Sequence, residues 1–257
     1  MSSYSPYIPK SFMAVFAHPD DIEFSCAGTL AKWVQAGARG AYVLVTSGDV
    51  GIAEAGMTKE RASDIREAEA TAAANAIGVT DVTYFRVGDS MVENNLALRK
   101  RIVREIRRFQ PEVIVSGDPT IVFNPGGGIN HPDHRAVGMA AVDAVYPSTG
   151  QPNLFEELGE EGLVAHKVRK MYVVSYTHGE TLVDISDTLE LKLEALLKHE
   201  SQVGHIEGLA DRMRQRAEQI GAGVDGVRYA ERFRVVTVEN DEKWAKLQEK
   251  APEQYTR

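Results

Sequence analysis

Short apolar runs alternate along this chain with longer segments whose apolar residues recur at helical spacing. Runs of the first kind are rich in β-branched and aromatic residues, which is typical of strands buried on both faces. Segments of the second kind place apolar residues three or four positions apart, which predicts helices. The predicted strands are residues 12–16, 42–46, 82–85, 113–116, 171–176 and 234–238. The predicted helices are residues 27–36, 59–77, 96–109, 134–145 and 188–202.

This alternation of strands and helices predicts an α/β fold. It favours a Rossmann-like three-layer sandwich, in which a mainly parallel sheet carries helices on both faces. The length of 257 residues suits one such domain over residues 1–257. Residues 146–168 mix proline, glycine and acidic residues, so we expect a small lobe or a long loop there. Sheets of this kind bind ligands beyond the carboxyl ends of their strands, and functional residues are therefore expected in the loops that follow strands.

Composition and charge narrow the class of protein. Hydrophobic residues make up 43% and charged residues 26%, as in ordinary globular proteins. The formal net charge of -8 argues against a nucleic-acid partner, and the basic run at residues 99–108 fits the solvated face of a helix. The single cysteine, Cys26, excludes an intrachain disulfide. Because residues 1–10 lack a signal-peptide pattern and no apolar run approaches the roughly 20 residues of a membrane span, we expect a cytoplasmic protein without a membrane partner.

A histidine and two aspartates follow the first predicted strand directly. They are His18, Asp20 and Asp21, in the segment Ala-His-Pro-Asp-Asp. A hydrolytic zinc site takes three nitrogen or oxygen ligands from the protein and leaves a position for water. His18 and Asp21 can supply two of these ligands, and Asp20 can stand beside the metal to accept a proton from the water. The alternative is that Asp20 or Asp21 caps the helix that begins near residue 27.

A second cluster follows the fourth predicted strand, after a glycine-rich loop at residues 124–130. Its sequence is His131-Pro132-Asp133-His134, and proline favours the first turn of a helix. His131 then caps this helix, and His134 lies in its opening turn on the same face. His134 can be the third metal ligand, His131 can donate a proton into the cavity, and Asp133 can orient a histidine. The second cluster favours a metal site over a helix cap.

The two clusters together resemble the PIG-L/LmbE-like family of zinc-dependent N-acetylglucosaminyl deacetylases. Their order, each after a strand, is specific, and the resemblance extends over about residues 10–205. Further elements support it: the continuation of the first motif, an Arg-x-x-Glu helix that ends in a small turn, and a late His-x-Ser-Gln element. These are Ala27-Gly28-Thr29-Leu30-Ala31, Arg66-Glu67-Ala68-Glu69 with Ile77-Gly78, and His199-Glu200-Ser201-Gln202.

The resemblance implies a role for each residue of the two clusters. Zinc is expected on His18, Asp21 and His134, although ferrous ion suits two histidines and one carboxylate as well. Asp20 is expected to act as general base. His131 is expected to act as the acid or electrophile that stabilises the tetrahedral intermediate.

The resemblance also implies roles for three further side chains. Asp133 is expected to tune a histidine, and Arg66 and Asp89 are expected to hold sugar hydroxyls. Arg66 can also be an exposed helix arginine, and Asp89 a turn aspartate. The family often has a glutamate directly after the two aspartates, whereas here the acid comes one position later, at Glu23, which receives no catalytic role. His178 follows a predicted strand and is a candidate to line the same cavity.

We therefore expect a zinc-dependent hydrolase that removes acetyl from an N-acetylated amino sugar or its conjugate. In this mechanism zinc-bound water attacks the amide, with Asp20 as base. The candidate substrates are N-acetylglucosamine, its small glycosides including chito-oligosaccharides, and glucosaminyl conjugates of low-molecular-weight thiols. Several relatives assemble, so a homo-oligomer is also expected.

Three other functions are alternatives to this one. The first is a nucleotide-binding protein, but neither G-x-G-x-x-G nor a Walker pattern follows the first strand. The second is a non-catalytic metal-binding protein, which would have no need of Asp20 and His131. The third is the same zinc chemistry on a non-sugar or thiol-conjugate amide. It stays open because substrate choice depends on loops such as residues 48–58, 87–95 and 146–168.

Overall fold

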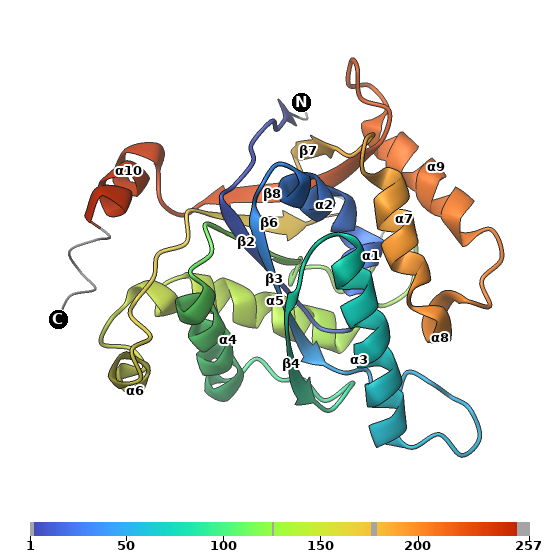
Figure 1. The fold of residues 1–257 in the computed structure, drawn as a ribbon, viewed down its shortest axis with the longest axis horizontal. Helices are drawn as coiled ribbons and strands as arrows, with labels where there is room; N and C mark the ends of the chain where they lie inside the picture. Colours follow the sequence, from blue (N-terminus) through green and yellow to red (C-terminus); the bar gives the residue numbers. More distant parts are fainter. Residues whose placement is uncertain (1–2, 125, 176–178, 251–257) are drawn as a thin grey trace.

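A computed structural model describes residues 3–124, 126–175 and 179–250 of the chain. Within these ranges eight strands form one sheet, in the order β1-β7-β8-β6-β5-β2-β3-β4 (Figure 1). The strands are β1 (Ser3–Tyr4), β2 (Ser11–Phe16), β3 (Arg39–Thr46), β4 (Asp81–Val87), β5 (Val113–Gly117), β6 (Lys170–Val174), β7 (Thr181–Asp184) and β8 (Ala230–Thr237). The helices are α1 (Asp21–Ser25), α2 (Ala27–Gln35), α3 (Lys59–Ala76), α4 (Leu96–Phe109), α5 (Pro132–Val145), η1 (Ser148–Gly150), α6 (Glu156–Glu160), α7 (Leu189–Leu197), α8 (Glu200–Val203), α9 (Leu209–Gly221) and α10 (Asp241–Lys250).

The sheet is mainly parallel, as predicted. Strands β4, β3, β2, β5 and β6 run parallel in that order, whereas β8 is antiparallel to both of its neighbours, β6 and β7. From β2 the chain moves outward to β3 and β4, and it then returns to the other side of β2 to form β5. Loops diverge at such a reversal and leave a crevice at the carboxyl ends of the two central strands. The loops that follow β2 and β5 carry the two motifs.

Each face of the sheet is covered by its own set of helices, which makes the three layers (Figure 1). Strand β2 is buried on both faces because its side chains alternate between two cores. Phe12, Ala14 and Phe16 pack in the core formed with α2 and α3, and Met13 and Val15 pack in the core formed with α4 and α5. The Rossmann-like α/β sandwich predicted from the sequence is confirmed. No helix in the described ranges has the length and apolar character that a bilayer span requires.

Most predicted elements are present within a few residues of their expected bounds, and α4 matches its prediction at both ends. The predicted helix at residues 188–202 is wrong in one respect. It divides into α7 and α8 at His199, whose side chain is fully buried against another part of the chain. Strands β1 and β7 and helices α9 and α10 were not predicted. Tyr176, at the predicted end of the fifth strand, lies outside the described residues.

Residues 146–168 pack against α4, and Arg107 of this helix is buried beneath them. Arg107 is 2% exposed, and its guanidinium donates hydrogen bonds to backbone carbonyls of this segment, including Gln151 at 2.8 Å and Leu154 at 3.0 Å. The prediction that the basic run lies on a solvated face is therefore wrong for Arg107, because the segment folds back over it. Other side chains of the run pair with acids, as in Arg99–Asp143 at 2.5 Å.

Candidate active site

Three side chains from two distant segments converge where the loops after β2 and β5 meet. His18 Nδ1 lies 3.1 Å from His134 Nε2, and the same nitrogen of His134 lies 3.0 Å from Asp21 Oδ1. The second oxygen of Asp21 lies 3.6 Å from His18 Nδ1. All three residues offer a ligand atom within 4.8 Å of the others. Two imidazole nitrogens and a carboxylate form a donor set that fits zinc, and also ferrous ion.

The neighbouring histidines keep the Asp21 carboxyl ionised. Burial alone would raise the pKa of the Asp21 carboxyl, but the charge and hydrogen bonding of His134 and His18 hold it well below its usual range. The backbone N–H of His18 also donates to Asp21 Oδ2 at 2.8 Å, which fixes the carboxylate on the inside of the loop. Asp21 is therefore ionised and oriented before any ligand arrives.

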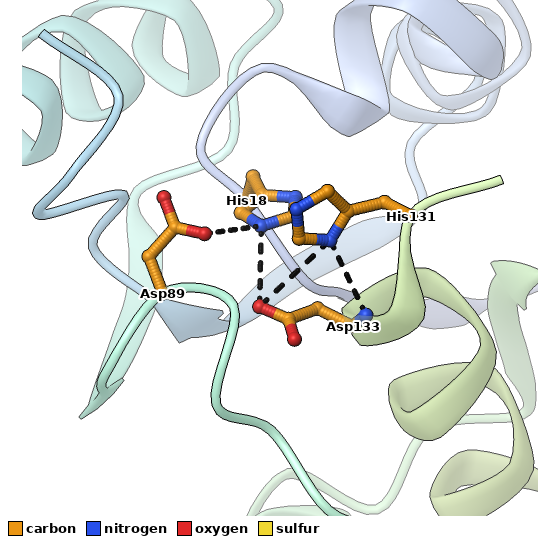
Figure 2. A group of neighbouring side chains, drawn as sticks. All are labelled: His18, Asp89, His131 and Asp133. Atoms are coloured by element: carbon orange, nitrogen blue, oxygen red, sulfur yellow. Dashed lines mark hydrogen bonds and ion pairs between the residues drawn. The ribbon is translucent and has the colours of Figure 1, made fainter. Parts of the chain in front are cut away.

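The second nitrogen of His18 faces two more carboxylates (Figure 2). His18 Nε2 lies 3.2 Å from Asp89 Oδ1 and 3.4 Å from Asp133 Oδ2. Burial lowers the pKa of His18, but the hydrogen bonds to Asp133, Asp21 and Asp89 raise it to about 12. A histidine that binds a metal through one nitrogen commonly donates its other N–H to a carboxylate, which sets the tautomer and the ring orientation. The structure places Asp133 and Asp89 where such partners stand.

Asp133 is fully buried and is satisfied mainly by backbone groups. It accepts hydrogen bonds from Ser90 N at 2.7 Å and from Val92 N at 3.2 Å. Its Oδ2 is closer to His18, at 3.4 Å, than to His131 Nδ1, at 4.0 Å (Figure 2). The sequence indicated that Asp133 orients a histidine but not which one, and the geometry favours His18.

His131 caps helix α5, as the sequence predicted. Its Nδ1 accepts a hydrogen bond from Asp133 N at 3.2 Å (Figure 2), and Pro132 occupies the first turn. Because Nδ1 acts as acceptor, the neutral ring carries its proton on Nε2. Burial and the neighbouring charge of His18 lower the pKa of His131, which favours this neutral form at pH 7. His131 Nε2–H is thus a hydrogen-bond donor, and Ser90 Oγ lies 3.4 Å from Nε2.

The structure does not show the helix cap that was the alternative role for Asp20 or Asp21. Asp20 stands at the N-cap position of α1, but its side chain makes no capping hydrogen bond. Helix α2, which the alternative concerned, begins after Cys26 and has no side-chain cap. Asp20 instead meets Arg66, whose Nη2 lies 3.1 Å from Asp20 Oδ1.

The two residues expected to hold sugar hydroxyls are both engaged within the protein. Arg66 is 4% exposed, and its second terminal nitrogen, Nη1, donates to Gly48 O at 3.3 Å. Asp89 is 7% exposed; it contacts His18 through Oδ1, and its backbone N–H donates to Asp49 Oδ1 at 2.7 Å. The structure thus brings both residues to the loop that carries His18 and Asp20. These contacts show that Arg66 is not an exposed helix arginine. They also show that Asp89 does more than form a turn.

One residue of the site, Asn130, was not singled out from the sequence. Asn130 Oδ1 lies 3.0 Å from His134 Nδ1, and its side-chain amide donates to Ile121 O at 2.9 Å. It therefore orients His134 so that Nε2 faces Asp21. Its place directly before the His-Pro-Asp-His segment was the signal that could have identified it.

Residues of the remaining motif elements contact one another in two pairs, Glu23 with His199 and Glu69 with Ser201. Glu23 is buried against His199, with 3.2 Å between Oε2 and Nε2, and burial raises the pKa of Glu23. Glu23 therefore supports the loop through this side-chain pair. Glu69 accepts hydrogen bonds from Ser201 N at 2.7 Å and Ser201 Oγ at 2.6 Å. These contacts join α3 to α8, and α8 to the segment that carries the candidate ligands. His178 lies outside the described residues.

A cavity of about 240 Å³ is lined by two of the three candidate ligands, Asp21 and His134. Asp21, His134 and Asn130 form part of its wall, together with the apolar side chain of Phe24 and the carboxylate of Asp118. A concave site with mostly apolar walls and a few polar groups is what a small-molecule ligand requires. The cavity and the donor set define a metal-dependent enzyme of the α/β class.

Comparison with known families and proteins agrees with this class. The PIG-L family, described as GlcNAc-PI de-N-acetylase, matches residues 13–145. Diacetylchitobiose deacetylase from Thermococcus kodakarensis is 31% identical over 194 residues, covering 75% of this chain and 70% of that protein. A probable N-acetyl-alpha-D-glucosaminyl L-malate deacetylase of Bacillus anthracis is 29% identical, over 75% of this chain and 81% of its own length. The chain belongs to the PIG-L family of de-N-acetylases, and the resemblance stated from the motifs is confirmed.

Solved structures extend the match over most of the fold. N,N'-diacetylchitobiose deacetylase from Pyrococcus horikoshii, in complex with an inhibitor, has a TM-score of 0.81 and 28% identity, covering 89% of this chain and 84% of that one. A 4-carboxy-2-hydroxymuconate hydratase from Pseudomonas putida has a TM-score of 0.74 at 21% identity. The second likeness concerns the fold alone, since a fold hosts more than one reaction.

Proposed function

We propose that this protein is a metal-dependent hydrolase that removes the acetyl group from an N-acetylglucosamine-type sugar or a small conjugate of one. One observation carries the proposal: His18 Nδ1, His134 Nε2 and a carboxylate oxygen of Asp21 converge, with Asp20 next to Asp21 and His131 beside His18. Ligands for a metal, a base and a hydrogen-bond donor are the groups that hydrolysis of an unactivated amide requires. The relatives named as deacetylases of N-acetylated sugars support the same reading.

We assign the metal to His18, Asp21 and His134, with Asp133 and Asp89 on the far nitrogen of His18. A zinc or ferrous ion held there would lower the pKa of a water molecule to about 7 and polarise the amide carbonyl. The protein's own contribution is to hold the donor atoms in place before binding. Asn130 does this for His134, and the backbone N–H of His18 does it for Asp21.

Asp20 and His131 carry the proton chemistry in this proposal. Asp20 accepts a proton from the water molecule as that water attacks the carbonyl carbon of the acetamide. His131 Nε2–H donates a hydrogen bond to the carbonyl oxygen as negative charge develops on it. When the C–N bond breaks, Asp20 returns the proton to the leaving amine nitrogen. Asp20 is again ionised, and the acetic acid formed passes its proton to the amine or to solvent, so that acetate and the amino sugar leave the site.

The experiment that tests the proposal is acetate release from a panel of N-acetylated substrates by metal-loaded protein. The panel contains N-acetylglucosamine, diacetylchitobiose, a glucosaminyl conjugate and, as non-sugar controls, simple acetamides. Release that a chelator stops, and that Asp20→Ala lacks, supports the proposal and ranks the substrates. Release from the acetamides alone would overturn the sugar assignment and favour the same chemistry on another amide.

A further inference from the structure

Arg66 lies beneath the loop that follows β3, with its guanidinium directed at Asp20. It is 4% exposed, and its two terminal nitrogens are divided between two acceptors: Nη2 to Asp20 Oδ1 at 3.1 Å and Nη1 to Gly48 O at 3.3 Å. Within the part of the chain that the structure describes, Asp20 Oδ2 makes no hydrogen bond. Arg66 therefore occupies one oxygen of Asp20 and leaves the other for a water molecule.

Two glycines shape the space that Arg66 fills. A Cβ atom on Gly48 or on Gly51 would overlap Arg66 Nη1, and Gly48 also has a φ of +64°. Gly51 N donates to Gly48 O at 3.0 Å, which closes the turn around the guanidinium. Gln202 Nε2 donates to Gly51 O at 3.3 Å and fixes the turn from the side of α8. The chain thus builds a fitted space for a planar guanidinium beside Asp20.

We infer that Arg66 is a positioning residue for Asp20, which deepens the proposed function because it presumes Asp20 as the base. Arginine suits this role because it stays protonated and presents its donors in a rigid plane. It fixes the orientation of the carboxylate so that Oδ2 faces the attacking water. A residue that acts this way contributes to the chemical step and adds little to substrate affinity. This differs from holding sugar hydroxyls, the role expected from the family resemblance.

Steady-state kinetics of Arg66→Ala separate the two roles. If Arg66 positions Asp20, kcat falls at least about tenfold while KM stays within about twofold, and added guanidinium restores part of kcat. If Arg66 holds the sugar, KM rises and kcat changes little. A rise in KM with unchanged kcat, or no change in either constant, would overturn the inference.

Gly51→Ala provides a second test in which the guanidinium is retained. The new methyl group displaces Arg66 from its place and is expected to lower kcat in the same way as Arg66→Ala. The matched control is Gly159→Ala in α6, where an added Cβ meets nothing within 4 Å. Equal kcat values for Gly51→Ala and Gly159→Ala would contradict the inference. This pair decides the question even if Arg66→Ala does not fold.

A measurement that does not depend on activity separates this inference from the proposed function. The unfolding free energies of Arg66→Ala, Asp20→Ala and the double variant form a double-mutant cycle. Coupling is expected, so that Arg66→Ala costs less stability once Asp20 is absent. Additive effects would overturn the pairing, whatever the enzyme acts on. Wild-type protein without deacetylase activity would instead overturn the proposed function, and the cycle would still decide the pairing.

Discussion

His18 Nδ1 and His134 Nε2 lie 3.1 Å apart, although the two residues are separated by 116 positions in the sequence. Asp21 Oδ1 lies 3.0 Å from His134 Nε2. The three atoms are therefore close enough to bind one metal ion. Carboxylates surround the pair, and their charge needs compensation at that point. A divalent cation bound there would supply it.

Asp20→Ala and His134→Ala are expected to separate metal binding from catalysis. Asp20→Ala should keep the full metal content of the wild type while the turnover number falls by about 10²–10⁴, the contribution of a general base. His134→Ala should lose metal and activity together. Metal content per chain after gel filtration, measured beside kcat, checks both. Loss of metal from Asp20→Ala would assign Asp20 to the ligand set and contradict its role as base.

Asp133→Asn is expected to weaken metal binding without removing a ligand. Asp133 is fully buried and lies 3.4 Å from His18 Nε2, so the substitution removes a charge that supports the histidine. Supporting carboxylates of this kind are worth about 10–100-fold in metal affinity. Competition with a chelator at fixed pH measures the change. Asp143→Asn, on the same helix but paired with Arg99, is the control and should bind metal as the wild type does.

Removing one member of the Glu23–His199 pair is expected to destabilise the fold strongly. The two side chains are 1% and 0% exposed, so either partner would remain buried without the other. Glu23→Ala and His199→Ala should each lower the free energy of unfolding by about 3 kcal/mol, and the double variant should cost less than the sum. Denaturant titration measures this. Glu194→Ala, which breaks the exposed Lys198–Glu194 pair, should cost less than about 1 kcal/mol. Similar losses in all three single variants would contradict the burial argument.

The stability of the protein is expected to fall on the acid side of neutrality through His166. Burial lowers the pKa of His166 from its ordinary value of 6.5, while Nε2 donates to Pro111 O at 2.7 Å. The unfolded chain therefore binds a proton at His166 more readily than the folded chain does. As pH falls from above 6.5 towards the folded-state pKa, the contribution of His166 to stability decreases, and below that pKa it is constant.

The comparison of wild type with His166→Gln isolates this effect. Unfolding free energies measured from pH 7.5 to pH 5.5 should decrease more in the wild type than in the variant. Identical pH dependence in both proteins would show that His166 does not titrate differently in the folded state. Other histidines contribute equally to both curves, so the difference between the curves reports His166 alone.

Local sequence patterns predicted an element correctly where the spacing of its own apolar residues determines which of its faces are buried. The apolar run at residues 12–16 alternates between two cores, and the amphipathic spacing of residues 96–109 matches α4 at both ends. The His131-Pro132 pair predicted a helix N-terminus for a local reason, the preference of proline for the first turn. Weak patterns were missed, as in the four-residue strand β7 and the largely polar helix α9.

Pairings between distant segments could not be read from the sequence. His199 interrupts a predicted helix because it meets Glu23, which is 176 positions away. The sequence around Arg66 is like that of an arginine on the exposed face of a helix. Its burial becomes evident only from its contacts with Gly48 O and Asp20 in the structure. Such contacts follow from the order in which strands enter the sheet, and local propensity carries no information about that order.

The sequence by itself determined the class of fold, the two motifs and the residue types that suit a metal-dependent hydrolase. These follow from hydrophobic periodicity and from the limited set of side chains that can bind a metal or move a proton. Only the tertiary structure decided that Asp133 supports His18, that Asn130 orients His134 and that Arg66 holds Asp20. Each of these relationships is a distance of a few ångströms between side chains on different elements, and such distances exist only after the sheet has brought the elements together.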